Sequence, residues 1–179
     1  MAQKSLLRKL WENRWVLRSL PYTLYFNFHY LPLAQAVKLP IWLYKPRLLA
    51  CQGRVVIDPS TKISSGMIKL GNNVVSIYPD NGITWEHRGI MYFKGSASIG
   101  NSSYISTGKD SEITFGPRFH ATASFRLVSY YKISFGHSCT IGWDCIIMDT
   151  DLHALTRIDG SKSKGYGMIT IGKTETMLK

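Results

Sequence analysis

The chain has 179 residues, of which 45% are hydrophobic and 18% are charged, and its formal net charge is +11. This hydrophobic content is enough for one folded domain with an appendage, and it excludes a chain that is disordered throughout. The basic charge suits a nucleic-acid partner, but the chain shows no helix-turn-helix, zinc-finger or RNA-binding motif, so we expect no nucleic-acid binding.

The first third of the chain carries most of the excess positive charge. Residues 1–57 contain nine Lys or Arg and a single acid, Glu12. Between residues 4 and 20, Leu and Trp alternate at nearly helical spacing with the basic residues Lys4, Arg8, Lys9, Arg14 and Arg18. This pattern predicts a basic amphipathic helix. Two placements stay open: the helix lies on an anionic membrane surface, or it packs on the protein itself with its basic face in water.

The next segment is long enough to raise the question of a membrane span. Residues 19–37 contain no Lys, Arg, Asp or Glu. However, the segment includes the polar Asn27, His29 and Gln35 and the helix-breaking Pro21 and Pro32, and its aromatic residues are typical of an interface. The N-terminus also lacks the cleavage signature of a signal peptide. We therefore predict a cytoplasmic protein that could touch the inner membrane surface without crossing it.

A short tag recurs five times in the rest of the chain. Its copies are Ile68-Lys-Leu70-Gly71, Ala97-Ser-Ile99-Gly100, Ile113-Thr-Phe115-Gly116, Ile133-Ser-Phe135-Gly136 and Ile169-Thr-Ile171-Gly172. The tag glycines are 29, 16, 20 and 36 residues apart, and we interpret the last three intervals as scattering around one or two 18-residue turns. Between the tags the apolar residues lie six apart, as in Ile99 and Ile105, in Phe115, Ala121, Leu127 and Ile133, and in Phe135, Ile141 and Ile147.

Three hexads in one turn predict an all-β fold, a triangular solenoid in which short strands stack in coils and share one core. A sandwich or barrel is the alternative. The predicted organisation is an N-terminal segment of helical and irregular structure over residues 1–57, a β-helix over residues 58–172 and a short tail over residues 173–179. Cys51, Cys139 and Cys145 form no CxxC pair, so we expect small buried thiols in a reducing compartment and no disulfide.

The candidate chemistry lies at residues 148–153, which read Met-Asp-Thr-Asp-Leu-His. On an extended segment Asp149, Asp151 and His153 project to the same side. A carboxylate that accepts from one imidazole nitrogen leaves the other nitrogen free to take a proton from a hydroxyl. A solvent-exposed turn histidine and a divalent metal site made of these three residues are the alternatives. The hexads then stop, and residues 154–167 predict a loop that leaves the coil where a substrate could be held.

The hexads, the run from Ile141 to His153 and the loop after it resemble the hexapeptide-repeat acyltransferases, especially those that O-acetylate bacterial surface sugars. The resemblance covers about residues 58–172. It implies a left-handed parallel β-helix, a homotrimer with active sites between subunits, acetyl-CoA as acyl donor and a saccharide or lipid-linked sugar as acceptor. The function that it implies is therefore O-acetylation of a sugar hydroxyl.

The resemblance also implies roles for single residues. His153 matches the general base that deprotonates the sugar hydroxyl for direct attack on the thioester, and Asp149 or Asp151 would orient its imidazole. Trp143 and Asp144 would contact the acceptor sugar, although Trp143 could equally be a corner aromatic that covers the core edge. No residue is assigned to the binding of the donor.

The chain departs from the family after Ile171-Gly172. Such enzymes usually continue through further hexads, which supply much of the slot for the pantetheine arm, whereas this chain continues with Lys173-Thr-Glu175-Thr-Met177-Leu178-Lys179. The sequence therefore predicts a C-terminally truncated enzyme whose donor affinity is in question. The alternative is a noncatalytic β-helix relative with a binding or structural role.

Overall fold

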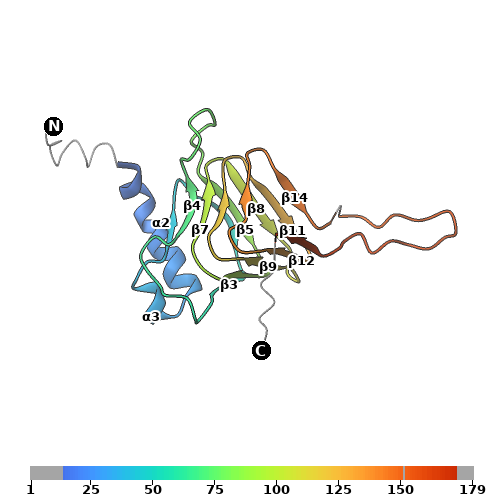
Figure 1. Ribbon diagram of the computed structural model, residues 1–179, viewed down its shortest axis with the longest axis horizontal. Helices are drawn as coiled ribbons and strands as arrows, with labels where there is room; N and C mark the ends of the chain where they lie inside the picture. The colour runs from blue at the N-terminus through green and yellow to red at the C-terminus, as the bar shows by residue number, and fades with distance from the viewer. Residues whose placement is uncertain (1–13, 151, 173–179) are drawn as a thin grey trace, which may run out of the picture.

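The computed structural model describes residues 14–150 and 152–172. Its strands form three five-stranded sheets, and consecutive strands of the chain belong to different sheets (Figure 1). All the strand pairings within these sheets are parallel. One strand from each sheet makes a coil, and five coils stack. The predicted all-β parallel β-helix is confirmed, and a sandwich or barrel of hairpins is excluded.

Each sheet takes every third strand. Sheet A contains β1 (Ile41–Leu43), β4 (Ile68–Asn72), β7 (Ala97–Gly100), β10 (Phe119–Ala121) and β13 (Thr140–Ile141). Sheet B contains β2 (Arg47–Cys51), β5 (Ile83–His87), β8 (Ser103–Thr107), β11 (Arg126–Ser129) and β14 (Ile146–Met148). Sheet C contains β3 (Arg54–Ile57), β6 (Ile90–Phe93), β9 (Glu112–Phe115), β12 (Lys132–Phe135) and β15 (Ile169–Ile171). We number the coils one to five in chain order.

The first coil begins earlier than the sequence predicts. Strands β1, β2 and β3 lie within the segment expected to be helical or irregular, and they pair with β4, β5 and β6 of the second coil. The N-terminal helical part is therefore limited to α2 (Arg14–Tyr30) and α3 (Leu33–Ala36) within the described residues. The first coil lacks the Ile-x-Ile-Gly tag, which is why the repeat pattern does not reveal it.

A turn of the solenoid is longer than 18 residues. The partners in coils three, four and five are Ile99, Ala121 and Ile141 in sheet A, so neighbouring coils are 22 or 20 residues apart. Between Ala121 and Ile141 the two residues beyond three hexads lie in sheet C, where Ile133 and Phe135 of β12 both point inward. Three hexads plus this two-residue step make 20.

The tags also lie on two faces. The tags that end at Gly71 and Gly100 belong to sheet A, whereas those that end at Gly116, Gly136 and Gly172 belong to sheet C. The 16-residue interval therefore crosses from one sheet to another and is not a turn. Our interpretation of that interval as about one turn was wrong, because the same apolar-x-apolar-Gly pattern suits the end of a strand on either face. The 36-residue interval is one turn and not two, because β12 pairs directly with β15 and the arm supplies the extra length.

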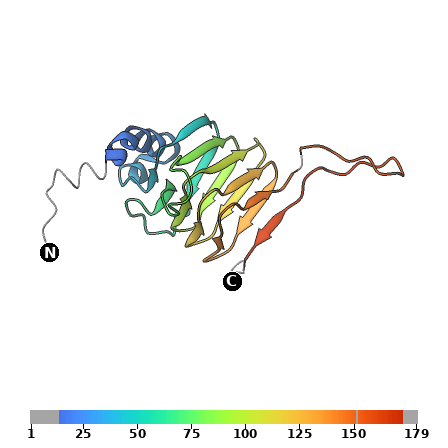
Figure 2. The ribbon, with the colours of Figure 1, turned by 90° about the horizontal axis from the view of Figure 1, so that it is seen from above.

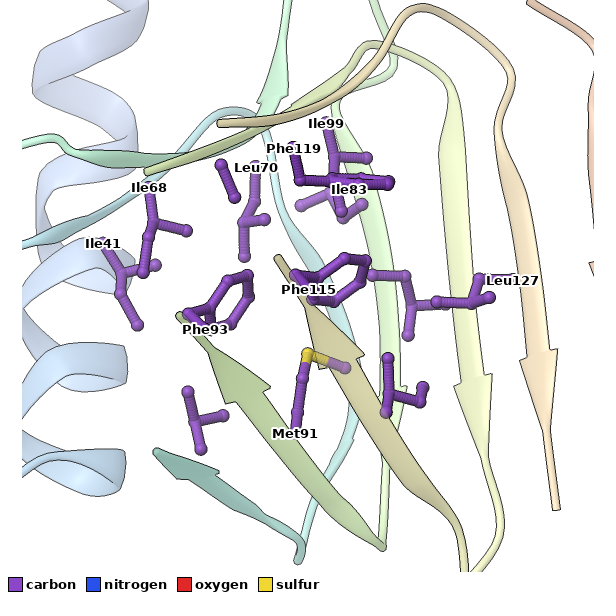
Figure 3. Close-up of a cluster of buried hydrophobic side chains, with 14 of the residues drawn as sticks. Ile41, Ile68, Leu70, Ile83, Met91, Phe93, Ile99, Phe115, Phe119 and Leu127 are labelled. Atoms are coloured by element: carbon purple, nitrogen blue, oxygen red, sulfur yellow. The ribbon is translucent and has the colours of Figure 1, made fainter. Parts of the chain in front are cut away.

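The inward residues of the three sheets form one continuous core (Figure 3). Hexad residues from every face are buried, among them Ile99, Ile105, Phe115, Ala121, Leu127 and Ile133. Phe93, Phe115 and Phe135 stack along sheet C, with ring centroids 5.0 and 5.4 Å apart. The core therefore runs along the solenoid axis, as the six-residue spacing predicts.

The corners between sheets use the left-handed backbone conformation. At the A/B corners, Ser102, Ser124 and Asp144 have φ of 58°, 55° and 54°, and at the C/A corners, Arg118 and Ser138 have 59° and 53°. Short polar side chains tolerate this conformation better than bulky ones. The repeated sign of φ turns the chain by the same sharp bend in each coil.

Helix α2 covers the end of the solenoid beside the first coil (Figures 1 and 2). Its buried Ser19, Thr23 and Asn27 lie four residues apart and accept hydrogen bonds from alternate backbone N–H groups of the β1 segment. Their donors are the backbone N–H groups of Lys45, Leu43 and Ile41, at 3.1 Å each. Helical side chains thus occupy the place of a neighbouring strand, and they satisfy an edge that would otherwise be unpaired.

Candidate active site

Asp149 is buried at the corner between sheets B and C, and its carboxylate holds the preceding coil. It is 5% exposed. Its Oδ2 accepts from Ser129 Oγ at 2.7 Å and from Tyr131 N at 3.0 Å, and its Oδ1 accepts from Tyr130 N at 2.8 Å. The side chain therefore satisfies two turn amides of the coil below, which is a structural task.

Thr107, two coils earlier, also accepts hydrogen bonds from turn amides of the preceding coil. Its Oγ1 accepts from Arg88 N at 2.9 Å and, more weakly, from Gly89 N at 3.4 Å. The corner thus needs a polar acceptor whether or not a reaction occurs there. The position of Asp149 follows from the fold, independently of any catalytic role.

The chain does not stay extended between Asp149 and His153. Leu152 has a φ of 63°, and its backbone N–H donates to Thr150 Oγ1 at 3.0 Å, which closes a tight turn. The expected alternation of side chains therefore breaks, and the prediction that the two residues project from an extended segment to one side was wrong. The turn chemistry of Thr150 overrides the strand pattern. Asp151, the other predicted partner, lies outside the described residues.

His153 is exposed and lies at the base of a two-stranded arm. Isolated antiparallel bridges join Thr150 to Tyr166 and Thr156 to Lys162. In both ribbon views this arm extends well away from the solenoid body (Figures 1 and 2). Its span includes the predicted excursion over residues 154–167. The interruption of the hexads thus corresponds to chain that leaves the coil and returns to begin β15.

A hollow of about 510 Å³ separates the arm from the end of β14. Its walls include Met148, Asp149, Leu155, Lys164 and Tyr166. The ring of Tyr166 also contacts that of Tyr131 in the fourth coil, with centroids 4.9 Å apart, so the arm is anchored at its base. The backbone of His153 lies against Gly165 of this hollow, and the walls combine apolar side chains with an acid and a cation.

Trp143 and Asp144 lie at the opposite end of β14, at the A/B corner of coil five. Trp143 is 57% exposed, and Asp144 occupies one of the left-handed corner positions. Asp144 therefore has a structural reason to be present, because Asp tolerates this conformation. The exposed indole leaves a flat apolar surface in solvent.

Tyr78 joins these two residues, and the sequence analysis missed it. It comes from the loop over residues 73–81 between β4 and β5, and its hydroxyl donates to Asp144 Oδ2. Its ring centroid lies 6.4 Å from that of Trp143. The hydrogen bond from Tyr78 lowers the pKa of Asp144, and a second bond from Ser124 acts in the same direction.

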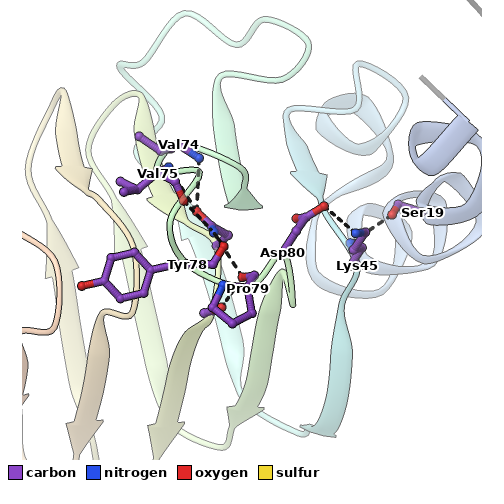
Figure 4. Close-up of polar contacts among 9 residues, drawn as sticks. Ser19, Lys45, Val74, Val75, Tyr78, Pro79 and Asp80 are labelled. Atoms are coloured by element: carbon purple, nitrogen blue, oxygen red, sulfur yellow. Dashed lines mark hydrogen bonds and ion pairs between the residues drawn. The ribbon is translucent and has the colours of Figure 1, made fainter. Parts of the chain in front are cut away.

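Two buried neighbours hold the loop that carries Tyr78: Ser102, whose hydroxyl donates to the Pro79 carbonyl, and Asn101, which makes more of the contacts. Asn101 Oδ1 accepts from Val74 N at 3.2 Å, and its Nδ2 donates to the carbonyl oxygens of Tyr78 and Pro79 at 3.3 and 3.2 Å (Figure 4). At the other end of the loop, Asp80 pairs with Lys45. Tyr78 is thus presented from an ordered support, although its partner is 66 residues away in sequence.

The described residues hold no group of three His, Cys, Asp or Glu side chains placed to bind a metal ion. Cys139 and Cys145 are free thiols, as the hexad spacing predicts, and Cys51 is free as well. Burial raises the pKa of Cys51 and Cys139, which disfavours the reactive thiolate at neutral pH.

Comparisons with known proteins found no match to a family model, to a curated protein or to a solved structure. Within residues 14–150 and 152–172, no helix combines the length and the apolar character that crossing a membrane requires.

Proposed function

We propose that this chain is an acetyl-CoA-dependent O-acetyltransferase that acts on a saccharide hydroxyl. The observation that carries the proposal is an exposed histidine at the point where an arm leaves a parallel β-helix, with its backbone against Gly165 in the wall of a hollow that both apolar and polar residues line. His153 takes the proton of the sugar hydroxyl, and the oxygen attacks the thioester carbonyl directly. The C–S bond then breaks, and the departing thiolate takes the proton back from the imidazolium.

The charge of the arm favours an anionic acyl donor. It carries Arg157, Lys162 and Lys164 against a single acid, Asp159, within the described residues, and all four are exposed. A phosphorylated coenzyme is attracted to such an excess of cations. Leu152, Leu155 and Ile158 are exposed on the same arm. Apolar side chains on an extended arm favour contact with a second copy, which supports the homotrimer that the family resemblance implies. The left-handed winding of the β-helix is proposed from the resemblance alone.

The cluster at the other end of β14 would bind a sugar unit other than the one that is acetylated. It consists of Tyr78, Trp143 and Asp144. Asp144 and Asp149 stand five residues apart at the two ends of β14, which separates them by up to about 17 Å along a strand. One monosaccharide does not span that distance. In this proposal the aromatic pair holds another unit of a longer acceptor, or it serves a site completed by a neighbouring subunit.

Asp149 is a positioning residue in this proposal. Its contacts with Ser129, Tyr130 and Tyr131 hold the strand end from which the arm departs. Asp151 keeps its predicted role as the carboxylate that orients the imidazole. Acetyl-CoA is a substrate here, and no metal takes part.

The decisive experiment incubates the full chain with acetyl-CoA, a panel of sugar acceptors and a thiol reagent. The wild type should release thiol with at least one acceptor, and His153→Ala should lower the rate by about 10²-fold or more. His120→Ala, on the outward side of β10, is the matched control and should keep full activity. Trp143→Ala should raise the KM for the acceptor more than that for acetyl-CoA.

Two outcomes contradict the proposal. Thiol release that survives His153→Ala would remove His153 as the base. Absence of release with every acceptor would favour a noncatalytic β-helix with a binding or structural role.

A further inference from the structure

Helix α2 departs from the polarity expected for a helix on a protein surface, because it exposes an apolar stripe and buries a polar one. The side that faces the solenoid buries Ser19, Thr23 and Asn27. One residue further along, with the same four-residue spacing, Leu20, Leu24 and Phe28 are 40%, 39% and 50% exposed. A helix with no partner other than its own domain normally points its apolar stripe inward. Here the polar stripe caps β1 and Phe26 beside it packs into the core, while the apolar stripe of Leu20, Leu24 and Phe28 faces outward.

The exposed apolar surface extends beyond this stripe. Tyr22 and Tyr25 of α2 are about half exposed, and Leu33 and Val37 continue the surface at α3. We define the outer helix face as the seven exposed residues Leu20, Tyr22, Leu24, Tyr25, Phe28, Leu33 and Val37. Contiguous apolar surface of this kind marks an interaction site in a soluble protein.

The charge around the outer helix face indicates the nature of its partner. Residues 14–57 contain six Lys or Arg and no Asp or Glu. Arg18 in α2 and Lys38 just after α3 are both exposed. Asp80 neutralises Lys45 beside Ser19, but Arg18 and Lys38 keep a basic excess at the face. An apolar face that carries tyrosines and has this basic excess matches the interfacial zone of an anionic bilayer, where aromatic rings lie at headgroup level and cations meet lipid phosphates.

We propose that the outer helix face binds the surface of an anionic lipid bilayer, with α2 and α3 lying in the interface. The arm extends from the end of the solenoid opposite these helices (Figures 1 and 2). Bound in this way, the protein holds its candidate active site away from the lipid headgroups. The inference is independent of the chemistry at His153, and its test does not use activity.

The test measures sedimentation of the full chain with vesicles of phosphatidylglycerol and, separately, of phosphatidylcholine. Binding to phosphatidylglycerol should be about tenfold tighter or more, and it should weaken in high salt. The double substitution Leu24→Glu and Phe28→Glu should weaken binding to phosphatidylglycerol by about tenfold or more, because it removes two apolar groups that the bilayer would bury and adds two negative charges. Ile77→Glu with Tyr104→Glu, which alters exposed apolar residues outside the helices and the arm, is the matched control and should leave binding unchanged.

A second variant tests the proposal even if the first does not fold. Arg18→Ala with Lys38→Ala keeps the apolar face and should weaken binding by about fivefold per charge. Circular dichroism and thermal melting verify that each variant folds. Equal binding to both lipids, no binding by the wild type, or undiminished binding by both helix variants would overturn the proposal. Light scattering that shows a dimer lost in Leu24→Glu with Phe28→Glu, without vesicle binding, would instead assign the face to a second copy.

Discussion

Single polar side chains hold the corner between sheets B and C in coils two to five, whereas in coil one the turn amides of Gln52 and Gly53 donate to the His87 carbonyl. Cys51, His87, Thr107, Ser129 and Asp149 stand at the ends of successive sheet B strands or just after them. Two of them accept from turn amides of the coil below, and two neighbouring pairs, His87 with Thr107 and Ser129 with Asp149, bond to each other. Buried backbone groups at a corner have no strand partner, so the side chains must supply one.

His87 should make folding stability depend on pH. Its Nε2 donates to the Arg54 carbonyl at 3.0 Å, and its Nδ1 accepts from the Thr107 hydroxyl at 2.8 Å, which suits the neutral ring. Burial lowers the pKa of His87 below the ordinary 6.5. The unfolded chain therefore binds the proton more readily, so stability is complete above the unfolded pKa and is lost as the pH falls below it toward the folded pKa.

We expect the free energy of unfolding to decrease between about pH 7 and pH 5 by up to about 1.4 kcal/mol per pH unit from this one group. Urea unfolding at a series of pH values measures it. His87→Gln should flatten the curve in that range, whereas His120→Gln, on the outward side of sheet A, should not. The same slope in His87→Gln would show that another group is responsible.

At the scale of the element, helix α2 caps the first coil with its buried polar side and presents the outer helix face to solvent with its other side. Asn27 contributes most to the cap, because its Oδ1 accepts from Ile41 N and its Nδ2 donates to Ile41 O at 2.7 Å. Thr23 accepts from Leu43 N. Without these side chains the first coil has a buried edge with unpaired donors, which costs free energy.

Asn27→Leu should therefore destabilise the fold by about 2–4 kcal/mol, because both backbone groups of Ile41 lose their partner in a buried place. Thr23→Val should cost about 1–3 kcal/mol for the amide of Leu43. Phe28→Gln, on the outward side of the same helix, should change stability by no more than about 0.5 kcal/mol. Chemical denaturation of the three variants gives these values. A loss below about 0.5 kcal/mol in Asn27→Leu would mean that the helix does not cap the coil.

Local spacing predicts some features of this chain well and is silent on others. Ile99, Ile105 and Leu127 are buried as the hexads predict, because one inward residue on each face is a property of neighbouring residues. The cap formed by Asn27 has no such signal, since polar residues four apart on a helix usually indicate a side that faces water. The sequence therefore reveals the coils and hides the way in which the first coil is closed.

The sequence also predicts some features of the candidate site and misses others. The departure of the chain after residue 153 is predicted, because the loss of the hexad spacing is visible in the sequence. The contact between Tyr78 and Asp144 is not predicted, because it depends on which coils stack and on where the inserted loop lies. The turn at Leu152 also escaped prediction, since the same residues alternate acceptably as a strand. Long-range packing and turn geometry are what the spacing of residues does not encode.

At the scale of the whole molecule, each coil meets only its neighbours, so stability should be the sum of coil-to-coil contacts. The rings of Phe93, Phe115 and Phe135 link coils two, three and four through the core. Phe115 occupies the middle, and it also contacts Phe119, with ring centroids 4.6 Å apart. Its removal disconnects the contacts on both sides at once.

Phe115→Ala should accordingly lower the free energy of unfolding by about 3–5 kcal/mol, the usual cost of emptying a buried aromatic site. It should also separate unfolding into two steps, because the ring stack that joins coil two to coil four through coil three is interrupted. Tyr104→Ala removes a ring of similar size from the exposed face of the same coil, and its cost should stay near about 0.5 kcal/mol. Urea unfolding followed by both circular dichroism and tryptophan fluorescence distinguishes the cases. Coincident transitions in Phe115→Ala would mean that the strand ladders alone transmit cooperativity from coil to coil, because backbone pairing is continuous in all three sheets and does not need the stacked rings.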